Sequence, residues 1–286
     1  MKPAALKKLL YWVEEREQMR LRRERGGDAP YTIDLILAKY RFCNVRREDD
    51  RVTGWIRDHI RGPFSNHPHL WFMLCIARQI NWPPTLRALI NSKGWPEDDE
   101  WRWPEAVSVM NSMKKRGEQV YTGAYMVRGP SQKGIAKAFW TMHNVLLPLW
   151  DERYLMGENL TDNPTLQGTT EGLQEYQGWG PFMSYQAVVD MRFTRLLENA
   201  PDRLTWAAAG PGTIRGLNRL YGRKVDAPLS QEQAVKELRV LYPLVNKVVG
   251  CDFSDIPNVC CEFDKYERAR LGEGKPRSLY KPETRF

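Results

Sequence analysis

The stretch Leu173-Gln174-Glu175-Tyr176-Gln177-Gly178-Trp179-Gly180-Pro181-Phe182 decides the fold that the sequence predicts. An apolar helical segment, 166–176, runs into Gly-x-Gly and directly into a second helical segment, 182–196. Two glycines two residues apart let the backbone turn sharply with positive φ. The first amides of the second helix have no helical partner, so they can bind a phosphate. An ordinary helical corner explains the same pattern, and the two interpretations stay open on this stretch alone.

Helical periodicity continues along most of the chain. We expect helices over residues 4–25, 46–61, 68–80, 83–92, 104–116, 132–149, 213–221, 230–247 and 257–269. A further helix is expected to open at Pro30, with Ile33, Ile36, Leu37 and Tyr40 at core spacing. Only residues 119–127 alternate like a strand, which allows a small β-hairpin at most. The absence of a βαβ rhythm disfavours a doubly wound nucleotide-binding fold. The fold class predicted is therefore mostly α.

The domain organisation expected from these patterns is simple. Residues 1–29 form a charged N-terminal helix, and residues 30–286 form one helical domain. That domain divides into two lobes at about 30–165 and 166–286.

Composition excludes several classes of protein. Hydrophobic residues make up 42 % of the 286, enough for a core, so the chain is neither disordered nor fibrous. The longest apolar run, Leu70 to Ala77, is too short to span a bilayer, and the N-terminus has no apolar signal core. Five cysteines, an odd number without a CxxC pair, predict no disulfide framework and a cytoplasmic protein. His67-Pro68-His69 is the only close histidine pair, so we expect neither a metal nor another cofactor.

The charge is unevenly distributed. A net charge of +8 with 11 tryptophans fits nucleic-acid binding, and equally a solvated basic surface over a Trp-rich core. Residues 151–200 are acidic, whereas residues 203–224 carry five basic residues and no acid. The basic stretch contains a second glycine-rich turn, Gly210-Pro211-Gly212, which leads into a helix with Arg215, Asn218 and Arg219. This turn is typical of an anion-binding nest.

Together the two turns resemble the helix-hairpin-helix of DNA repair glycosylases, whose hairpin reads Leu-Pro-Gly-x-Gly. In those enzymes a catalytic aspartate begins the helix after the hairpin. The corresponding position here is about Gly210, which carries no carboxylate. The resemblance implies a glycosylase-like helical fold. It also implies DNA contacts from the two turns and the basic helix, namely Gly178, Trp179, Gly180, Phe182, Gly210, Gly212, Arg215, Asn218 and Arg219.

Four ordered segments also resemble a narrower family, the alpha-glutamyl/putrescinyl thymine pyrophosphorylases, DNA base hypermodification proteins or helical domain of hydroxymethyluracil DNA kinases. The segments are Tyr40-Arg41-Phe42-Cys43-Asn44-Val45-Arg46-Arg47-Glu48-Asp49-Asp50-Arg51-Val52, the hairpin 178–186 with Asp190, residues 209–219, and Cys261-Glu262-Phe263-Asp264-Lys265-Tyr266. The resemblance implies a helical protein that handles modified pyrimidines in DNA, linked to phages with hypermodified thymine and to bacterial relatives acting against them.

A kinase would need a phosphate-binding loop. Gly129-Pro130-Ser131-Gln132-Lys133-Gly134 imitates the spacing but lacks the following Lys-Ser/Thr, and Gly272-Glu273-Gly274-Lys275 also fails. The sequence therefore predicts no independent ATP kinase.

Chemistry on a modified base needs a carboxylate, and three candidates stand out. Asp190 lies on the helix after the hairpin, and Glu262 has Lys265 three residues on. Asp190, Glu262 and Lys265 are the predicted catalytic groups, and Asp50 is the third candidate carboxylate. Each carboxylate could instead be half of an ordinary ion pair. Asp50, beside Arg51, is predicted to line a substrate pocket with Asn44 and Arg47.

Three functions fit these residues. The leading hypothesis is a monomeric DNA glycosylase that binds double-stranded DNA, flips out a bulky hydroxymethyl-derived pyrimidine, glucosylated forms included, and hydrolyses its N-glycosidic bond. The alternative is an amino acid or polyamine transferase, in which an amine displaces pyrophosphate from 5-pyrophosphomethyl-uracil in DNA. Arg46, Arg47, Arg51 or Lys265 would then hold the leaving group, and Glu262 would take the proton. The third is a reader of modified DNA that performs no chemistry.

Overall fold

A computed structural model describes residues 1–123, 129, 135–162, 164–274, 276 and 278–281. Within these residues the chain is helical and contains no strand, only the isolated bridges Tyr40–Leu279 and Glu97–Glu100. The prediction of a mostly helical protein is confirmed. Residues 119–123 of the expected hairpin form no strand, and residues 124–127 lie outside the described residues.

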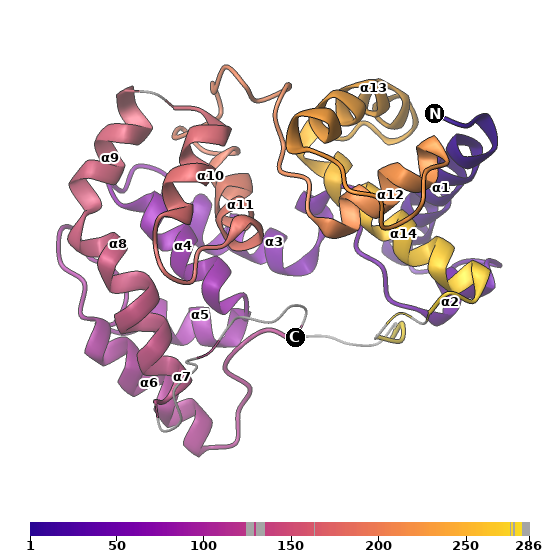
Figure 1. Cartoon of the computed structure of the whole chain (residues 1–286). Coiled ribbons are helices and arrows are strands. Elements are labelled where there is room, and N and C mark those ends of the chain that lie inside the picture. The colour runs from indigo at the N-terminus through magenta and orange to yellow at the C-terminus, as the bar shows by residue number, and fades with distance from the viewer. Residues whose placement is uncertain (124–128, 130–134, 163, 275, 277, 282–286) are drawn as a thin grey trace. The chain divides into compact units, whose positions relative to one another are not determined.

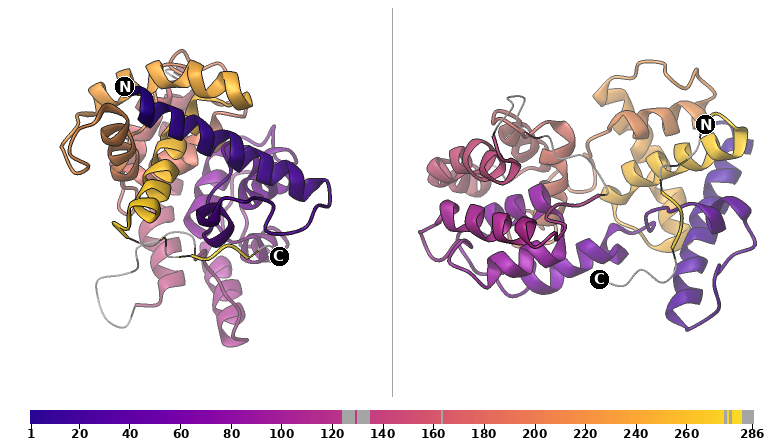
Figure 2. Two further views of the ribbon diagram at one scale, coloured as in Figure 1. Left: turned by 90° about the vertical axis from the view of Figure 1, so that its right-hand side faces the viewer. Right: turned by 90° about the horizontal axis from the view of Figure 1, so that it is seen from below.

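The chain forms two compact units, visible in Figures 1 and 2 as two groups of helices. Unit 1 comprises residues 1–50 and 204–286, so both ends of the sequence contribute to it. Unit 2 is the continuous segment 51–203. The division into a 1–29 helix and two lobes stays a prediction.

Unit 1 contains five α-helices within the described residues. They are α1 (Pro3–Glu24), α2 (Leu35–Lys39), α12 (Pro211–Tyr221), α13 (Gln231–Val249) and α14 (Ile256–Leu271). Proline at the first turn of α1, α12 and α14 suits a position whose amide has no helical partner. Trp12 of α1, Leu217 of α12, Leu238 of α13 and Phe263 of α14 are buried in the core of this unit. Burial of such side chains is the main force that holds the four longer helices together.

Glycine sets the packing of α12 on α14. A Cβ atom at Gly216 would lie 2.2 Å from the carbonyl oxygen of Cys260, and one at Gly212 would lie 2.3 Å from Sγ of Cys261. Any larger residue at Gly216 would collide with backbone. The two helices can therefore approach this closely only because α12 carries glycine on the face that meets α14.

The helix expected to open at Pro30 begins later. Asp34 is the N-cap of α2, and its Oδ1 accepts hydrogen bonds from the amides of Ile36 and Leu37. This cap fixes the first turn after residue 34. Ile33, expected in the core, is 96 % exposed, whereas Leu37 is buried.

Unit 2 contains nine α-helices within the described residues. They are α3 (Arg51–Ile56), α4 (Leu70–Ile80), α5 (Pro83–Ile90), α6 (Trp103–Lys115), α7 (Lys137–Phe139), α8 (Leu147–Asp151), α9 (Arg153–Asp162), α10 (Leu166–Gln174) and α11 (Pro181–Met191). Two π-helical segments, Arg57–Arg61 and Trp140–Leu146, interrupt regions expected to be continuous helix. Every residue of α4 is buried, so this helix forms the centre of unit 2. None of the described helices is both long and apolar enough to cross a bilayer.

The hairpin with Gly178 and Gly180 joins α10 and α11 within unit 2. Gly178 has φ +85°, and a Cβ there would lie 2.7 Å from the side chain of Val145. Both the backbone conformation and the lack of space therefore require glycine. Gly180 has φ −70° and is the N-cap of α11. Only one of the two glycines therefore uses positive φ. Trp179 is buried and donates its indole N–H to the carbonyl of Val145 at 3.1 Å, whereas Phe182 is 53 % exposed.

A buried ion pair connects α4 to α11. Both carboxylate oxygens of Asp190, which is fully buried, accept hydrogen bonds from the Arg78 guanidinium, and the Nη2–Oδ1 distance is 2.9 Å. Arg78 also donates to Thr53 and Asn81. Asp190 is thus half of an ion pair, and its partner Arg78 lies 112 residues away in the sequence.

Asp190→Asn should destabilise the protein by about 3–5 kcal/mol, because it leaves the charge of Arg78 buried without a counter-ion. Urea unfolding measures this loss. Glu232→Gln is the control, because it removes only the exposed pair with Lys236 and should leave the stability almost unchanged. Equal stability of the two variants would contradict a structural role for the Asp190–Arg78 pair.

Candidate functional site

The loop from Phe42 to Asp50 holds the predicted pocket residues of unit 1. Asn44 is its centre: Nδ2 donates to the carbonyl of Asp49 at 2.7 Å, and Oδ1 accepts from Nη2 of Arg16 at 2.7 Å. The backbone amide of Asn44 donates to Oδ1 of Asp50 at 2.9 Å. Arg16, from α1, is buried and also donates to the carbonyl of Cys43. Asn44 therefore shapes the loop with its own polar groups and places the carboxylate of Asp50.

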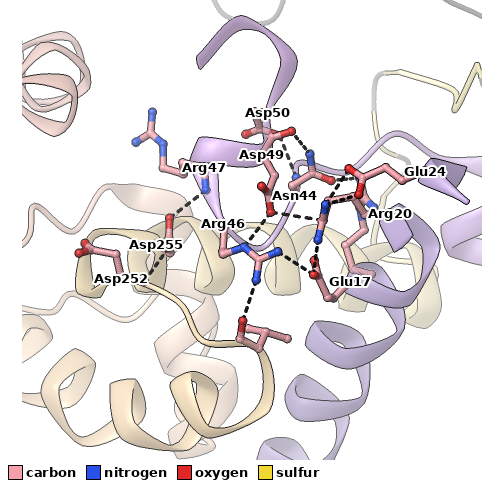
Figure 3. A network of polar contacts seen from close by, with 12 residues as sticks. Glu17, Arg20, Glu24, Asn44, Arg46, Arg47, Asp49, Asp50, Asp252 and Asp255 are labelled. Atoms are coloured by element: carbon pink, nitrogen blue, oxygen red, sulfur yellow. Dashed lines mark hydrogen bonds and ion pairs between the residues drawn. The ribbon is translucent and has the colours of Figure 1, made fainter. Parts of the chain in front are cut away.

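The next residues attach the loop to α1 and α13, as Figure 3 shows. The Arg46 guanidinium donates to Glu17, Asp49 and the carbonyl of Val249, at 2.7, 2.7 and 2.8 Å. Arg20 binds Glu17 in a bidentate pair and lies 3.3 Å from Asp49. Arg46, considered from sequence as a group that holds a leaving group, is thus occupied within the protein.

A buried aspartate anchors the other side of the loop. Oδ1 of Asp255 accepts the backbone amide of Arg47 at 2.9 Å, and Oδ2 accepts that of Asp252 (Figure 3). Burial raises the pKa of Asp255 to about 7. This carboxylate fixes the loop to the turn that precedes α14 and is not exposed to a ligand.

Glu262 and Lys265 face this loop from α14. Lys265 Nζ lies 2.6 Å from Oε2 of Glu262 and 4.7 Å from the centroid of the Phe42 ring. Oε2 of Glu262 also accepts the amide of Cys43 at 3.0 Å. The structure therefore brings Glu262 and Lys265, the predicted catalytic pair, against the loop of Asn44 and Asp50.

Asp50, at the end of the same loop, has a raised pKa. Burial raises its pKa to about 6; the amide of Asn44 and the charges of Arg47 and Arg16 oppose the rise, and the negative charge of Glu262 adds to it. The same surroundings raise the pKa of the Cys43 thiol well above its usual value, first through burial and then through Glu262 and Asp50. The cluster thus contains two neighbouring carboxylates, one held by a lysine and one that exchanges its proton near neutral pH.

A cationic group lies further along α14. Asp264, fully buried, accepts hydrogen bonds from Nε of Arg215 and Nε of Arg219, at 2.9 and 2.8 Å, and Arg268 Nε lies 3.3 Å away. Arg219 also binds Glu273. Three guanidinium groups face two carboxylates, so this face of α12 and α14 carries excess positive charge. Arg268 was not predicted from the sequence as part of this group, although it lies four residues after Asp264 and therefore on the same helical face.

The glycine turn before α12 has a packing role. Gly210 is the N-cap of α12 in extended conformation, and Gly212 lies against Cys261. Burial raises the pKa of the Cys261 thiol to about 11; the charge of Glu262 adds to the rise, while Lys265 and Arg215 oppose it. Cys261 therefore packs against α12 at Gly212.

The predicted DNA-contacting and catalytic residues fall into two sets. Asn44, Arg47, Asp50, Gly210, Gly212, Arg215, Asn218, Arg219, Glu262 and Lys265 belong to unit 1, and Arg51, Gly178, Trp179, Gly180, Phe182 and Asp190 to unit 2. Asn218 is buried, and its amide donates to the carbonyls of Val225 and Ala227 while accepting from Arg223. It shapes the turn after α12. The DNA-binding and catalytic roles stay predictions.

No three His, Cys, Asp or Glu side chains are grouped to hold a metal ion in the part of the chain that the structure describes. All five cysteines are free.

Comparison with known proteins identifies the chain first as a helical domain and then as a member of one family. The family described as "5-hmdU DNA kinase, helical domain" matches residues 3–276, so the chain belongs to it. A relative, the "5-hmdU DNA kinase" of Bacillus phage SP10, is 24 % identical over 279 residues, which cover 88 % of this chain and 43 % of the relative. The chain thus spans less than half of that relative's length. No solved structure matches.

These findings correct the leading hypothesis from sequence. The family and the relative are named for a kinase that acts on 5-hmdU DNA, and neither is a glycosylase or hydrolase. Excision of a flipped base by N-glycosidic hydrolysis was therefore wrong. The membership in the hypermodification family is confirmed, whereas a relationship to helix-hairpin-helix glycosylases is not shown.

In the wild-type protein, ionisation of Asp50 should lower the free energy of unfolding as the pH rises. Asp50→Asn should abolish this pH dependence. The pKa of Asp50 is about 6 in the folded protein, against 3.8 for an ordinary aspartate. The folded state then binds more protons between about pH 4 and 6, so the free energy of unfolding falls as pH rises through that window, by up to about 3 kcal/mol.

The measurement is urea unfolding of both proteins at a series of pH values. The stability of Asp50→Asn relative to wild type should increase with pH across the window. Asp226→Asn, at an exposed site of unit 1, is the control and should show no such trend. A difference between wild type and Asp50→Asn that does not change with pH would contradict the proton uptake assigned to Asp50.

Proposed function

We propose that this chain modifies 5-hydroxymethyluracil-derived bases in DNA, by transfer of an amine onto the activated 5-methylene carbon. The observation that carries the proposal is the cluster of unit 1, in which Asp50 and Glu262 stand together with Lys265 beside the arginine group of α12 and α14. Family membership and the name of the phage relative, a 5-hmdU DNA kinase, support the choice of base.

The reaction requires a base and a cation. The lone pair of the amine attacks the 5-methylene carbon, the carbon–oxygen bond breaks, and pyrophosphate leaves with the bonding electrons. The new carbon–nitrogen bond leaves one excess proton on nitrogen. Asp50, whose pKa is about 6, can accept that proton at neutral pH. Glu262 is the second acceptor, and Lys265 holds it in place at 2.6 Å.

The leaving group carries negative charge that must be stabilised as the bond breaks. Lys265 lies 2.6 Å from Glu262, and its side chain is part-exposed, so it can supply positive charge to a leaving group. Arg215 and Arg268, each 37 % exposed at the side chain, extend the positive surface along α12 and α14. Guanidinium groups bind phosphate oxygens in bidentate geometry, so these two arginines suit the phosphates of the DNA strand.

A second candidate function is recognition of 5-hmdU DNA on behalf of a kinase. The relative's name and its additional length favour it. In that case unit 1 would hold the DNA, and the phosphate-binding loop that this sequence lacks would come from another polypeptide segment. Incubation with ATP and hydroxymethyluracil DNA tests this candidate: the chain alone should transfer no phosphate.

The transfer reaction is testable directly. Duplex DNA containing 5-pyrophosphomethyl-uracil is incubated with the protein and a set of amines, and nucleosides are then analysed by mass spectrometry. We expect an amine-dependent gain in base mass together with release of pyrophosphate. Tight binding without any change in the DNA would contradict transfer and favour the recognition module.

Asp50→Asn and Glu262→Gln should each lower kcat about 10²- to 10⁴-fold, the usual effect of losing a general base. Glu232→Gln, an exposed control on α13, should keep full activity. The pH profile separates the two carboxylates: wild-type activity should rise through about pH 6, and Asp50→Asn should lose that limb. Full activity in both variants would exclude this cluster as the site.

DNA binding has its own test. Arg215→Gln and Arg268→Gln should each weaken binding to DNA of any sequence, and each should reduce the slope of log K against log salt by about 1. Lys236→Gln, on the exposed face of α13, is the matched control. An unchanged salt slope in both arginine variants would place the DNA elsewhere.

A further inference from the structure

Unit 2 contains a cavity of about 940 Å³ that the proposed reaction does not use. Its volume is that of a site for a small organic molecule. It lies between α9, the start of α4, the loop before Trp101 and the turn after α11. All of its lining residues belong to unit 2.

The floor and the rim of this cavity differ in chemistry. Trp71, Leu160 and Ala200 line the floor and are 1–6 % exposed, so they offer an apolar surface. Asp98, Glu158 and Asp162 line the rim and are exposed. None of these three acids forms an ion pair with another described residue. A ligand that fits must therefore combine an apolar body with a polar end.

The charge of the rim decides the sign of that end. The fourth acid, Asp99, is bound by Arg153, Tyr154 and His69, and Arg153 is neutralised by it. Arg195 donates hydrogen bonds to the backbone carbonyls of Ser65 and His67. Three acids then face one arginine, a net charge of −2, which attracts a cation.

A buried imidazole adds a hydrogen-bond acceptor. His69 is 6 % exposed and lines the cavity, and its Nε2 lies 3.0 Å from Oδ1 of Asp99. Three hydrogen-bonding partners hold the pKa of Asp99 below its usual value, so its carboxylate is ionised and accepts the N–H of His69. In the neutral ring this leaves Nδ1 as an acceptor, suited to an ammonium donor.

We propose that this cavity binds a small amphipathic organic cation, with its apolar part against Trp71 and Leu160 and its ammonium group among Asp98, Glu158, Asp162 and His69. The proposal goes beyond the proposed function and does not depend on it, because binding here needs neither DNA nor a leaving group.

The test is calorimetric titration of the whole chain without DNA, with three probes of one shape. They are the cation 2-phenylethylamine, the neutral 2-phenylethanol and the anion phenylacetate. The amine should bind saturably and more tightly than the alcohol, and phenylacetate should bind least. Absence of saturable amine binding, or equal affinity for amine and alcohol, would overturn the proposal whatever the outcome of the transfer assay.

Variants locate the binding. Glu158→Gln and Asp162→Asn together should weaken amine binding by about fivefold or more, because the two substitutions remove two of the negative charges that attract the ammonium group. Affinity for the alcohol should not change. Asp151→Asn, an exposed acid on α8 that does not line the cavity, is the control. Unchanged amine affinity in the double variant would place the ligand at another site.

Discussion

The close approach of α12 and α14 is the constraint on which the candidate site depends. Gly216 meets the carbonyl of Cys260 with no space for a side chain, and Gly212 lies against Cys261. This contact brings Arg215 and Arg219 within hydrogen-bonding distance of Asp264. It also places α12 against the segment of α14 that contains Cys261 and Glu262. If the helices stood further apart, the arginines would lose their counter-ion and the charge of Asp264 would be buried alone, an arrangement that proteins avoid.

The two carboxylates of the cluster illustrate how environment separates similar groups. Glu262 accepts an amide and has a lysine at 2.6 Å, both of which stabilise its charge. For Asp50 the effect of burial outweighs the amide of Asn44 and the charges of Arg47 and Arg16. The two acids thus have different partners and surroundings, and this supports assigning them different tasks.

Sequence patterns predicted the helices well because periodicity is a local property. The helix at 4–25 and the two helices around Gly178 follow from spacing alone. Partners distant in sequence could not be predicted in this way. Asp190 pairs with Arg78, 112 residues away, and Glu262 accepts the amide of Cys43, 219 residues away. No pattern in one sequence specifies such pairs, which explains why Asp190 was considered a catalytic group while its arginine went unnoticed.

Errors in the prediction had local causes as well. The helix expected to begin at Pro30 begins at Leu35 instead, because the side chain of Asp34 caps the helix at that point. Glycosylase function was inferred from two turns whose glycines have packing roles: a side chain at Gly178 would collide with Val145, and one at Gly212 would collide with Cys261. Glycine-rich turns report a spatial requirement of the backbone, and the same requirement arises from packing and from phosphate binding.

The arrangement of the two units along the chain has a consequence for synthesis on the ribosome. Unit 2 is one uninterrupted segment, so all of its residues have been made once residue 203 is added. Unit 1 needs Trp12 from the first helix and Phe263 from the last. The N-terminal helix must therefore wait, with its apolar face unpaired, while about two hundred residues are added, which at typical speeds takes on the order of ten seconds or more. During that interval α1 is the segment most in need of protection by a chaperone.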